Sequence, residues 1–303
     1  MRRLLTIALM AGASRPASAQ AGPFGRWDLT VHDGANTWPM WLELSAGPPV
    51  NGRLQGRTGH ALPLEDLELA GIQVRFTLPS EHPRPDLPRF EAVVAGDRMV
   101  GALVMPSGSR LQVTGRRAPA LERGEPLVWG EEVDLLASGL GGWTVRNPTR
   151  NGWRIDNGEL VNEPPSSDLI TKGRFTDFKL HLEVNVPPEG NSGIYLRGRH
   201  EVQVQDDHGK PPDSRRMGGI YGQVTPTALP AKLAGEWQTF DITLVGRRVT
   251  VVLNGVTMLE NVEIPGITGG ALDSNEADPG PLMLQGDHSA IRYRNIRITP
   301  AQQ

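Results

Sequence analysis

The 303-residue chain contains no cysteine, so disulfide bonds, thiolate catalysis and cysteine-ligated metal sites are excluded. Aromatic residues make up only 5% of the chain, and no block of lysine and arginine interleaved with aromatics suggests a nucleic-acid partner. Helical periodicity is almost absent. No apolar stretch approaches the roughly 20 residues that a membrane-spanning helix needs. The sequence therefore predicts a protein made of β-strands, with no nucleic-acid partner and no transmembrane segment.

The first nineteen residues have the pattern of a secretory signal peptide. Arg2 and Arg3 form a basic start, residues 4–13 form an apolar stretch, and residues 17–19 are small enough for cleavage. The apolar stretch is too short to span a bilayer. We expect residues 1–19 to be removed and the mature protein to be periplasmic or secreted.

Glycine (36 residues) and proline (26) are abundant and spread along the chain, which is typical of many short strands joined by turns. Residues 119–127 lack any apolar pattern and are interpreted as a linker between units at 20–118 and 128–303. The first unit has about seven short strand patterns, which indicates a small antiparallel β-barrel or sandwich. The second has longer strands, such as 178–186 and 238–245, that suit a two-sheet jelly-roll sandwich. The predicted fold class is all-β.

A row of polar side chains is expected on one face of a hairpin within residues 191–205. Apolar residues occupy the alternate positions, which predicts a sheet with one buried face and one face available to a ligand. The polar positions are Tyr195, Arg197, Arg199, Glu201, Gln203 and Gln205.

The loop length decides which of these side chains face one another. A three-residue loop at 198–200 would place Arg197 opposite Glu201, and Tyr195 opposite Gln203. A two-residue loop would break the polar pattern on the partner strand, because a slip of one residue turns every side chain to the other face. We therefore expect the three-residue loop.

Seven blocks in the second unit, in the same order, resemble the 3-keto-disaccharide hydrolase domain family. They lie within about 129–299 and include the stretch Asn-Ser-Gly-Ile-Tyr-Leu-Arg at 191–197 and Gln-Gly-Asp-His at 285–288. The resemblance implies a concanavalin-like jelly-roll sandwich that cleaves glycosides whose sugar is oxidised at C3. It does not cover residues 20–119.

Such a reaction has clear chemical requirements. A ketone at C3 acidifies the proton on C2, so a base can remove it and the group on C1 leaves by β-elimination; water then adds to the enone. A general base, a donor to the leaving oxygen and a group near the enolate oxygen are needed, and the paired carboxylates of ordinary glycosidases are not. A non-catalytic carbohydrate-binding module on the same sandwich fold is the alternative.

Two residues are candidate catalytic groups. His288 lies in a polar turn after an apolar strand, and histidine titrates near neutral pH; its alternative is a solvent-exposed turn histidine. Glu201 is the second candidate, as a base or a metal ligand, and its alternative is a cross-strand ion pair with Arg197 that only stabilises the hairpin.

Further polar residues are candidates for binding the substrate. Arg197 could hold the enolate, Tyr221 could contact a sugar ring and Gln285 could donate and accept hydrogen bonds, although Tyr221 and Gln285 could equally be packing residues. The full set is Tyr195, Arg197, Gln203, Asp206, Tyr221 and Gln285.

The loop at 206–208 carries acidic oxygens of the type that hard cations prefer, with a plain acidic turn as the alternative. The sequence requires no cofactor, leaves a divalent cation open and assigns no metal ligand. It also leaves the oligomeric state open. The tryptophans are interpreted as core anchors rather than sugar platforms; they are Trp27, Trp38, Trp41, Trp129, Trp143, Trp153 and Trp237.

Overall fold

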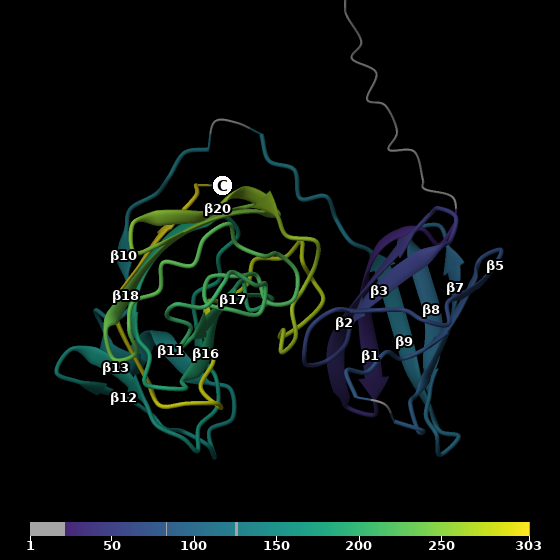
Figure 1. Ribbon diagram of the computed structural model, residues 1–303, viewed down its shortest axis with the longest axis horizontal. Helices are drawn as coiled ribbons and strands as arrows, with labels where there is room; N and C mark the ends of the chain where they lie inside the picture. Colours follow the sequence, from purple (N-terminus) through teal and green to yellow (C-terminus); the bar gives the residue numbers. More distant parts are fainter. Residues whose placement is uncertain (1–21, 83, 125–126, 303) are drawn as a thin grey trace, which may run out of the picture.

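The computed structural model describes residues 22–82, 84–124 and 127–302, so the predicted signal peptide at 1–19 lies outside the described residues. Strands dominate, and the single helical element in this part of the chain is a short 3-10 helix, η1 (Gly139–Gly142). Two units lie side by side and are joined by one connecting segment (Figure 1). The all-β prediction is confirmed. No helix in the described ranges is long and apolar enough to cross a membrane.

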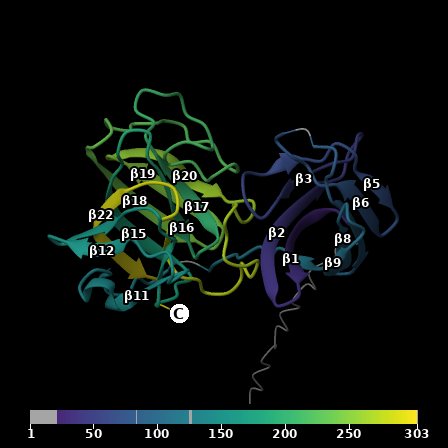
Figure 2. The same ribbon diagram turned by 90° about the horizontal axis from the view of Figure 1, so that it is seen from below.

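The first unit is one nine-stranded antiparallel sheet with strand order β4-β3-β2-β1-β9-β8-β7-β6-β5. The sheet curls around its own core, as the view from below shows (Figure 2). Trp27, Phe76 and Phe90 are among its fully buried side chains. The strands are β1 (Gly25–Asp33), β2 (Asn36–Ser45), β3 (Asn51–Gln55), β4 (Leu62–Pro63), β5 (Glu68–Ala70), β6 (Gln73–Thr77), β7 (Arg89–Ala95), β8 (Arg98–Val104) and β9 (Arg110–Arg117).

The second unit is a sandwich of two antiparallel sheets, as predicted. The larger sheet contains β10 (Val133–Asp134), β12 (Trp153–Asp156), β13 (Glu159–Asn162), β15 (Phe178–Asn185), β18 (Trp237–Val245), β19 (Arg248–Leu253), β20 (Val256–Glu263) and β22 (Ile291–Pro300). The smaller sheet contains β11 (Trp143–Val145), β14 (Leu169–Thr171), β16 (Asn191–Leu196), β17 (His200–Gln205) and β21 (Met283–Leu284).

The burial pattern explains why these segments are strands. In β15 every second side chain from Phe178 to Val184 is buried, which is the period of a strand with one face on a core. Almost every residue of β16 and β17 is buried instead. The polar side chains that the smaller sheet carries are therefore largely shielded from bulk water.

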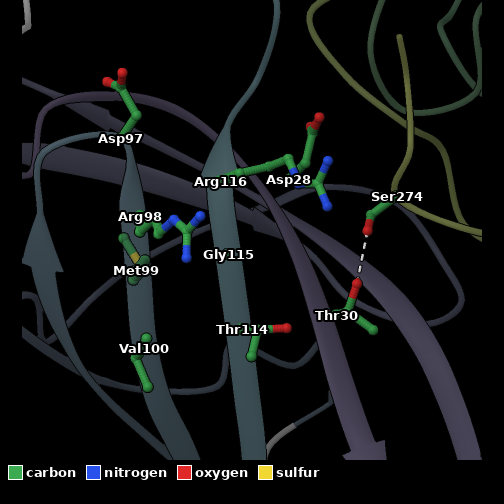
Figure 3. Close-up of a pocket in the computed structure, with 10 residues that line it drawn as sticks. All are labelled: Asp28, Thr30, Asp97, Arg98, Met99, Val100, Thr114, Gly115, Arg116 and Ser274. Atoms are coloured by element: carbon green, nitrogen blue, oxygen red, sulfur yellow. Dashed lines mark hydrogen bonds between the residues drawn. The ribbon is translucent and has the colours of Figure 1, made fainter. Parts of the chain in front are cut away.

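An apolar contact and a hydrogen bond join the two units. Trp41 of β2, fully buried, packs with Ile267 and Ala271 from the segment that follows β20. On the neighbouring strand β1, the Thr30 and Ser274 hydroxyls lie 2.8 Å apart across the junction (Figure 3). Trp41 is therefore a buried core residue, as predicted, but the apolar cluster that contains it lies between the two units rather than inside the first unit.

Candidate functional site

A polar cleft of about 920 Å³ lies between the two units. The first unit contributes one wall, from the start of β2 and from the loop after β3. The second unit contributes the floor and the opposite wall, from β16, β17 and the loops around them. The side chains that line the cleft include Trp38, Arg57, Arg146, Asp168, Asn191, Tyr195, Glu201, Gln203, Tyr221, Gln285, Asp287 and His288.

The β16–β17 hairpin has a different register from the predicted one. Tyr195 faces Glu201, and the three-residue loop is residues 197–199 rather than 198–200. Arg197 and Gly198 both adopt the left-handed conformation, with φ of 53° and 66°, and close a tight turn. The cross-strand pairing is therefore shifted by two residues from the predicted one. The polar side chains stay on one face of the sheet, but Arg197 lies in the turn instead of in a strand. The predicted pair of Arg197 and Glu201 is therefore wrong.

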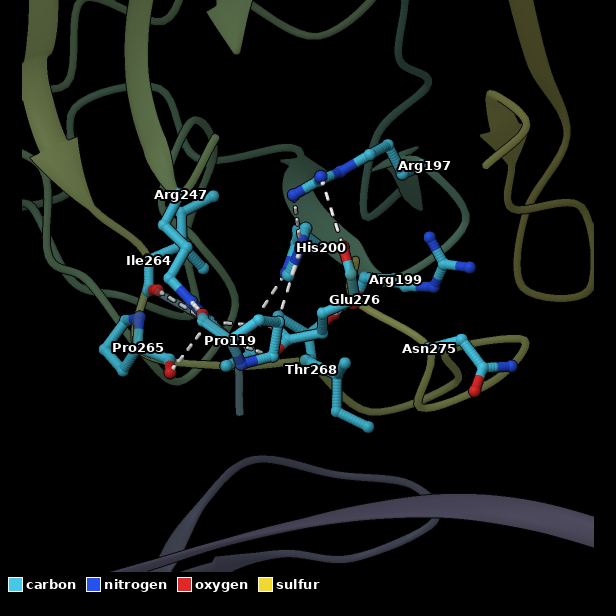
Figure 4. Close-up of polar contacts among 12 residues, drawn as sticks. Pro119, Arg197, Arg199, His200, Arg247, Ile264, Pro265, Thr268, Asn275 and Glu276 are labelled. Atoms are coloured by element: carbon cyan, nitrogen blue, oxygen red, sulfur yellow. Dashed lines mark hydrogen bonds and ion pairs between the residues drawn. The ribbon is translucent and has the colours of Figure 1, made fainter. Parts of the chain in front are cut away.

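Arg197 points away from the cleft into a buried polar cluster. Its guanidinium donates to the carbonyl oxygens of Gly246 at 2.9 Å and Glu276 at 3.3 Å. His200 lies in the same cluster, and Arg247 forms an ion pair with Glu276 there (Figure 4). Arg197 is fully buried and does not line the cleft, so its predicted contact with substrate is not supported. Burial lowers the pKa of His200 well below its usual range, and the nearby Arg197 adds to this shift.

Glu201 lies at the base of the cleft, only 4% exposed, and burial raises its pKa to about 8. The charges of Asp168 and Asp287 raise the pKa further, and Tyr195 opposes the shift. The carboxyl therefore holds its proton at neutral pH and is poised to donate it.

The position of Glu201 depends on a glycine in the facing strand. A Cβ atom on Gly193 would lie 2.2 Å from Glu201 Oε1, well inside van der Waals contact. Only a residue without a side chain leaves room for the carboxyl there.

Tyr195 and Tyr221 line the cleft together with this carboxyl. The Tyr195 hydroxyl donates to the Gly269 carbonyl at 2.9 Å, and burial raises its pKa well above the usual range. The backbone N–H of Tyr221 donates to the Glu201 carbonyl oxygen at 3.0 Å. Tyr221 is half-buried, and burial together with the charge of Glu201 raises its pKa. Both hydroxyls therefore stay protonated and can only donate or accept hydrogen bonds.

Amide side chains extend the polar floor. Gln203 Nε2 donates to Asn191 Oδ1 at 2.9 Å, so its orientation is fixed. The backbone N–H of Gln285 donates to Gly193 at 2.9 Å. Within the described residues, the buried Gln285 Oε1 has no hydrogen-bond partner. A buried amide oxygen without a partner is costly unless a ligand hydroxyl supplies the donor, which agrees with the predicted role of Gln285 in binding.

His288 lies on the edge of the cleft, exposed, beside Asp287. Its Nδ1 is 2.5 Å from Asp287 Oδ1. Because a carboxylate only accepts hydrogen bonds, Nδ1 carries the proton and the other ring nitrogen, Nε2, is left as a base. The two candidate catalytic residues, His288 and Glu201, thus line the same cleft.

Asp206 does not line the cleft. Its carboxylate accepts the backbone N–H of Glu189 at 3.1 Å, which is a role within the loop. Its neighbour Asp207 is buried and binds Lys210 and the Met217 N–H, each at 2.9 Å. Over the described ranges, no group of three or more acidic or histidine side chains forms a metal-binding cluster. The carboxylates of Asp206 and Asp207 are thus both engaged in contacts within or next to this loop.

Several cleft residues were not predicted. Asp168 accepts Arg146 at 3.0 Å and a weaker bond from the Gly286 N–H at 3.3 Å, so it supports the turn before His288. In the sequence, the polar run that ends at Asp168, directly before the buried strand β14, could have indicated Asp168 as a site residue. Trp38 and Arg57 come from the first unit, and no pattern in the sequence places them near Glu201.

A jelly-roll sandwich with a polar cleft over one sheet is an architecture of carbohydrate-active proteins. Residues 133–299, more than half of the chain, match the model of the 3-keto-alpha-glucoside-1,2-lyase-like domain family, and the chain belongs to this family. The suspected family and the carbohydrate-related class are confirmed by this match.

Solved structures with similar folds include two from Parabacteroides distasonis ATCC 8503, each described as a candidate glycosyl hydrolase. The first is 28% identical to this chain, and the alignment covers 58% of this chain and 93% of the solved chain, with a TM-score of 0.49. The second is 24% identical, with coverages of 56% and 98% and a TM-score of 0.46. The carbohydrate binding module CBM66 from Bacillus subtilis is 11% identical over 52% of this chain and 94% of that module, with a TM-score of 0.34. No curated protein matches the chain.

Proposed function

We propose that the protein is an exported enzyme that cleaves 3-keto-glycosides, among them 3-keto-disaccharides. The observation that carries this proposal is the pairing, in one cleft, of a buried carboxyl with a pKa of about 8 and a histidine held by a carboxylate. Pairs of titratable groups with such different environments are typical of acid–base catalysis. The match to the 3-keto-alpha-glucoside-1,2-lyase-like family supports the choice of 3-keto-sugars as substrates.

The two groups suit the two proton transfers of the elimination. His288 Nε2 takes the proton from C2, and the electron pair forms the enolate of the C3 ketone. The C1–O bond then breaks, and Glu201 gives its proton to the leaving oxygen. A base and an acid on opposite sides of the reacting bond allow both steps at neutral pH.

Hydration of the enone restores both residues. The Glu201 carboxylate takes a proton from water as the oxygen bonds to C1, and the protonated His288 returns a proton to C2. One glycoside and one water give the free 3-keto-sugar and the leaving group. Tyr195, Tyr221, Gln203 and Gln285 border the same space and are proposed to bind the sugar hydroxyls and the C3 oxygen.

Substitution of the two catalytic candidates tests this proposal. Turnover of a 3-keto-disaccharide by the purified protein is expected, and Glu201→Gln or His288→Ala should each lower kcat/KM by roughly 10²–10⁴-fold, as expected for loss of a general acid or base. His181→Ala is the matched control. His181 also pairs with an aspartate, Asp241, at 2.7 Å, but outside the cleft, so its loss should leave kcat/KM unchanged. Full activity of both catalytic variants would refute the assigned roles.

The alternative remains a non-catalytic carbohydrate-binding role, because the sandwich fold serves binding modules and enzymes alike. Binding of unoxidised sugars in calorimetry, with no turnover of keto-sugars, would favour it. The export part of the proposal rests on the pattern of residues 1–19 and is tested separately. N-terminal sequencing of protein recovered from a periplasmic or culture fraction should find residues 1–19 removed.

A further inference from the structure

The cleft above Glu201 is incomplete without the first unit. Residues 36–39 at the start of β2 and residues 57–59 after β3 form one wall of it. This part of the chain lies outside the family match at 133–299. The first unit therefore adds a surface to the cleft that the family domain does not provide by itself.

The two units are in close contact beside the cleft, so this wall has a fixed position. A Cβ atom on Gly269 would lie 2.2 Å from the Gly59 carbonyl oxygen. A Cβ atom on Gly222 would lie equally close, at 2.2 Å, to the Cβ of His60. At these points the backbone of one unit therefore lies against the backbone or a side-chain stem of the other.

A short chain of hydrogen bonds connects this wall to the proposed catalytic centre. Tyr195, which faces Glu201 across the hairpin, donates from its hydroxyl to Gly269 O at 2.9 Å. The next residue, Gly270, donates its N–H to Arg57 O at 3.0 Å. The backbone of Arg57 is therefore linked, through Gly269 and Gly270, to Tyr195, the residue opposite Glu201.

The side chains on this wall are suited to a sugar ring. Trp38 was expected to be a core anchor and does pack against the core of the first unit, but it is only partly buried and also lines the cleft. The Arg57 guanidinium lies 5.3 Å from the centre of the Trp38 ring. An indole offers a flat apolar surface for the C–H face of a sugar, and a stacked guanidinium keeps several N–H donors free for hydroxyls. The cleft volume of about 920 Å³ is near the top of the range of about 300–1,000 Å³ for small-molecule sites, so it has room for more than one ring.

We propose that the first unit builds the subsite for the second ring of the substrate, with Trp38 and Arg57 as the residues that contact it. The proposal rests on the proposed function, because the ring that reacts is taken to lie over Glu201. It makes the protein selective for 3-keto-disaccharides over 3-keto-glycosides with a small leaving group. The first unit is then a specificity element of the enzyme.

The test compares kcat/KM for a 3-keto-disaccharide with kcat/KM for the corresponding methyl 3-keto-glucoside. Loss of one well-packed aromatic contact is expected to cost about 1.4 kcal/mol, so Trp38→Ala should lower the ratio of the two values by about tenfold. Arg57→Ala should lower it less, because its side chain is at the edge of the contact. Trp129→Ala is the matched control: Trp129 is also partly buried and stacked with a cation, Lys179 at 4.6 Å, but outside the cleft.

An unchanged ratio in both Trp38→Ala and Arg57→Ala, with melting temperatures showing folded protein, overturns the subsite. If the wild-type protein turns over neither substrate, the proposed function fails instead. Calorimetry then decides the subsite on its own: the unoxidised disaccharide should bind more weakly to Trp38→Ala than to Trp129→Ala. Equal affinities of these two variants would also overturn it.

Discussion

Two cavities of this protein each contain a buried acid with a raised pKa, and their surroundings differ. In the cleft, Glu201 has a pKa of about 8 and shares the space with His288 and Tyr221. In the smaller cavity of about 540 Å³ beside Thr30 and Ser274, Asp28 has a pKa raised to about 10, first by burial and then by Glu276 (Figure 3). Burial together with a neighbouring acid thus raises the pKa of Asp28 at least as much as that of Glu201 is raised in the cleft. The neighbours decide which acid can do chemistry.

The neighbours of Asp28 belong to the contact between the units. Glu276, whose charge raises the pKa of Asp28, is paired with Arg247 in the buried cluster beneath the hairpin. Over the described residues, neither carboxylate oxygen of Asp28 has a hydrogen-bond partner. The junction between the units therefore disfavours the charged form of Asp28. Glu201 instead faces the open space of the cleft, which is proposed to hold the substrate.

Apart from substitution of the two catalytic candidates themselves, the largest expected effect comes from moving Glu201. In Gly193→Ala the new methyl group would overlap the carboxyl, at 2.2 Å from Oε1, and force the carboxyl out of place. Displacement of a catalytic group by about 1 Å can cost on the order of 10²-fold, so kcat/KM should fall by about that factor. Gly47→Ala is the control, since its Cβ would meet its nearest neighbour, Pro49 O, at an ordinary 3.7 Å. Equal activity of the two variants would show that Glu201 need not be held in place.

The next effect is the dependence of turnover on pH. If Glu201 donates a proton to the leaving oxygen, its protonated form is active, and kcat/KM should fall about tenfold per pH unit above its pKa of about 8. The measurement is kcat/KM for a 3-keto-disaccharide between pH 6 and pH 10. A rise up to pH 8 followed by a plateau would reverse the roles, with Glu201 as the base.

The smallest effect concerns stability and the second cavity. The folded-state pKa of Asp28, about 10, is above its unfolded value of 3.8, so the folded state holds a proton that the unfolded state has released. Stability from this group therefore falls as pH rises between these values. Asp28→Asn removes the titration, so its melting temperature relative to wild type should rise between pH 5 and pH 9. Asp33→Asn, at the exposed end of the same strand, is the control, and the same pH trend in both variants would argue against Asp28.

The alternation of polar and apolar residues was enough to predict the β-sandwich and the polar face of the hairpin. It could not predict the register, because that depends on Arg197 taking a left-handed conformation, which arginine rarely adopts. The wall made by Trp38 and Arg57 was also missed. It arises from contact between segments such as Gly59 and Gly269, more than two hundred positions apart, and local patterns carry no information about such contacts.

The glycines at the junction have a consequence for comparing relatives. Gly222, Gly266 and Gly269 each face an atom of the first unit at 2.2 Å from where a Cβ would lie: His60 Cβ, Trp41 Nε1 and Gly59 O. Gly222 also has a φ of 64°, which favours glycine whether or not a first unit is present. Gly266 and Gly269 have no such constraint, so a homologous domain that stands alone is free of these contacts and can carry larger residues at these two positions. Glycine at both 266 and 269 is therefore a marker, readable from sequence alone, for homologues that dock a first unit in the same orientation.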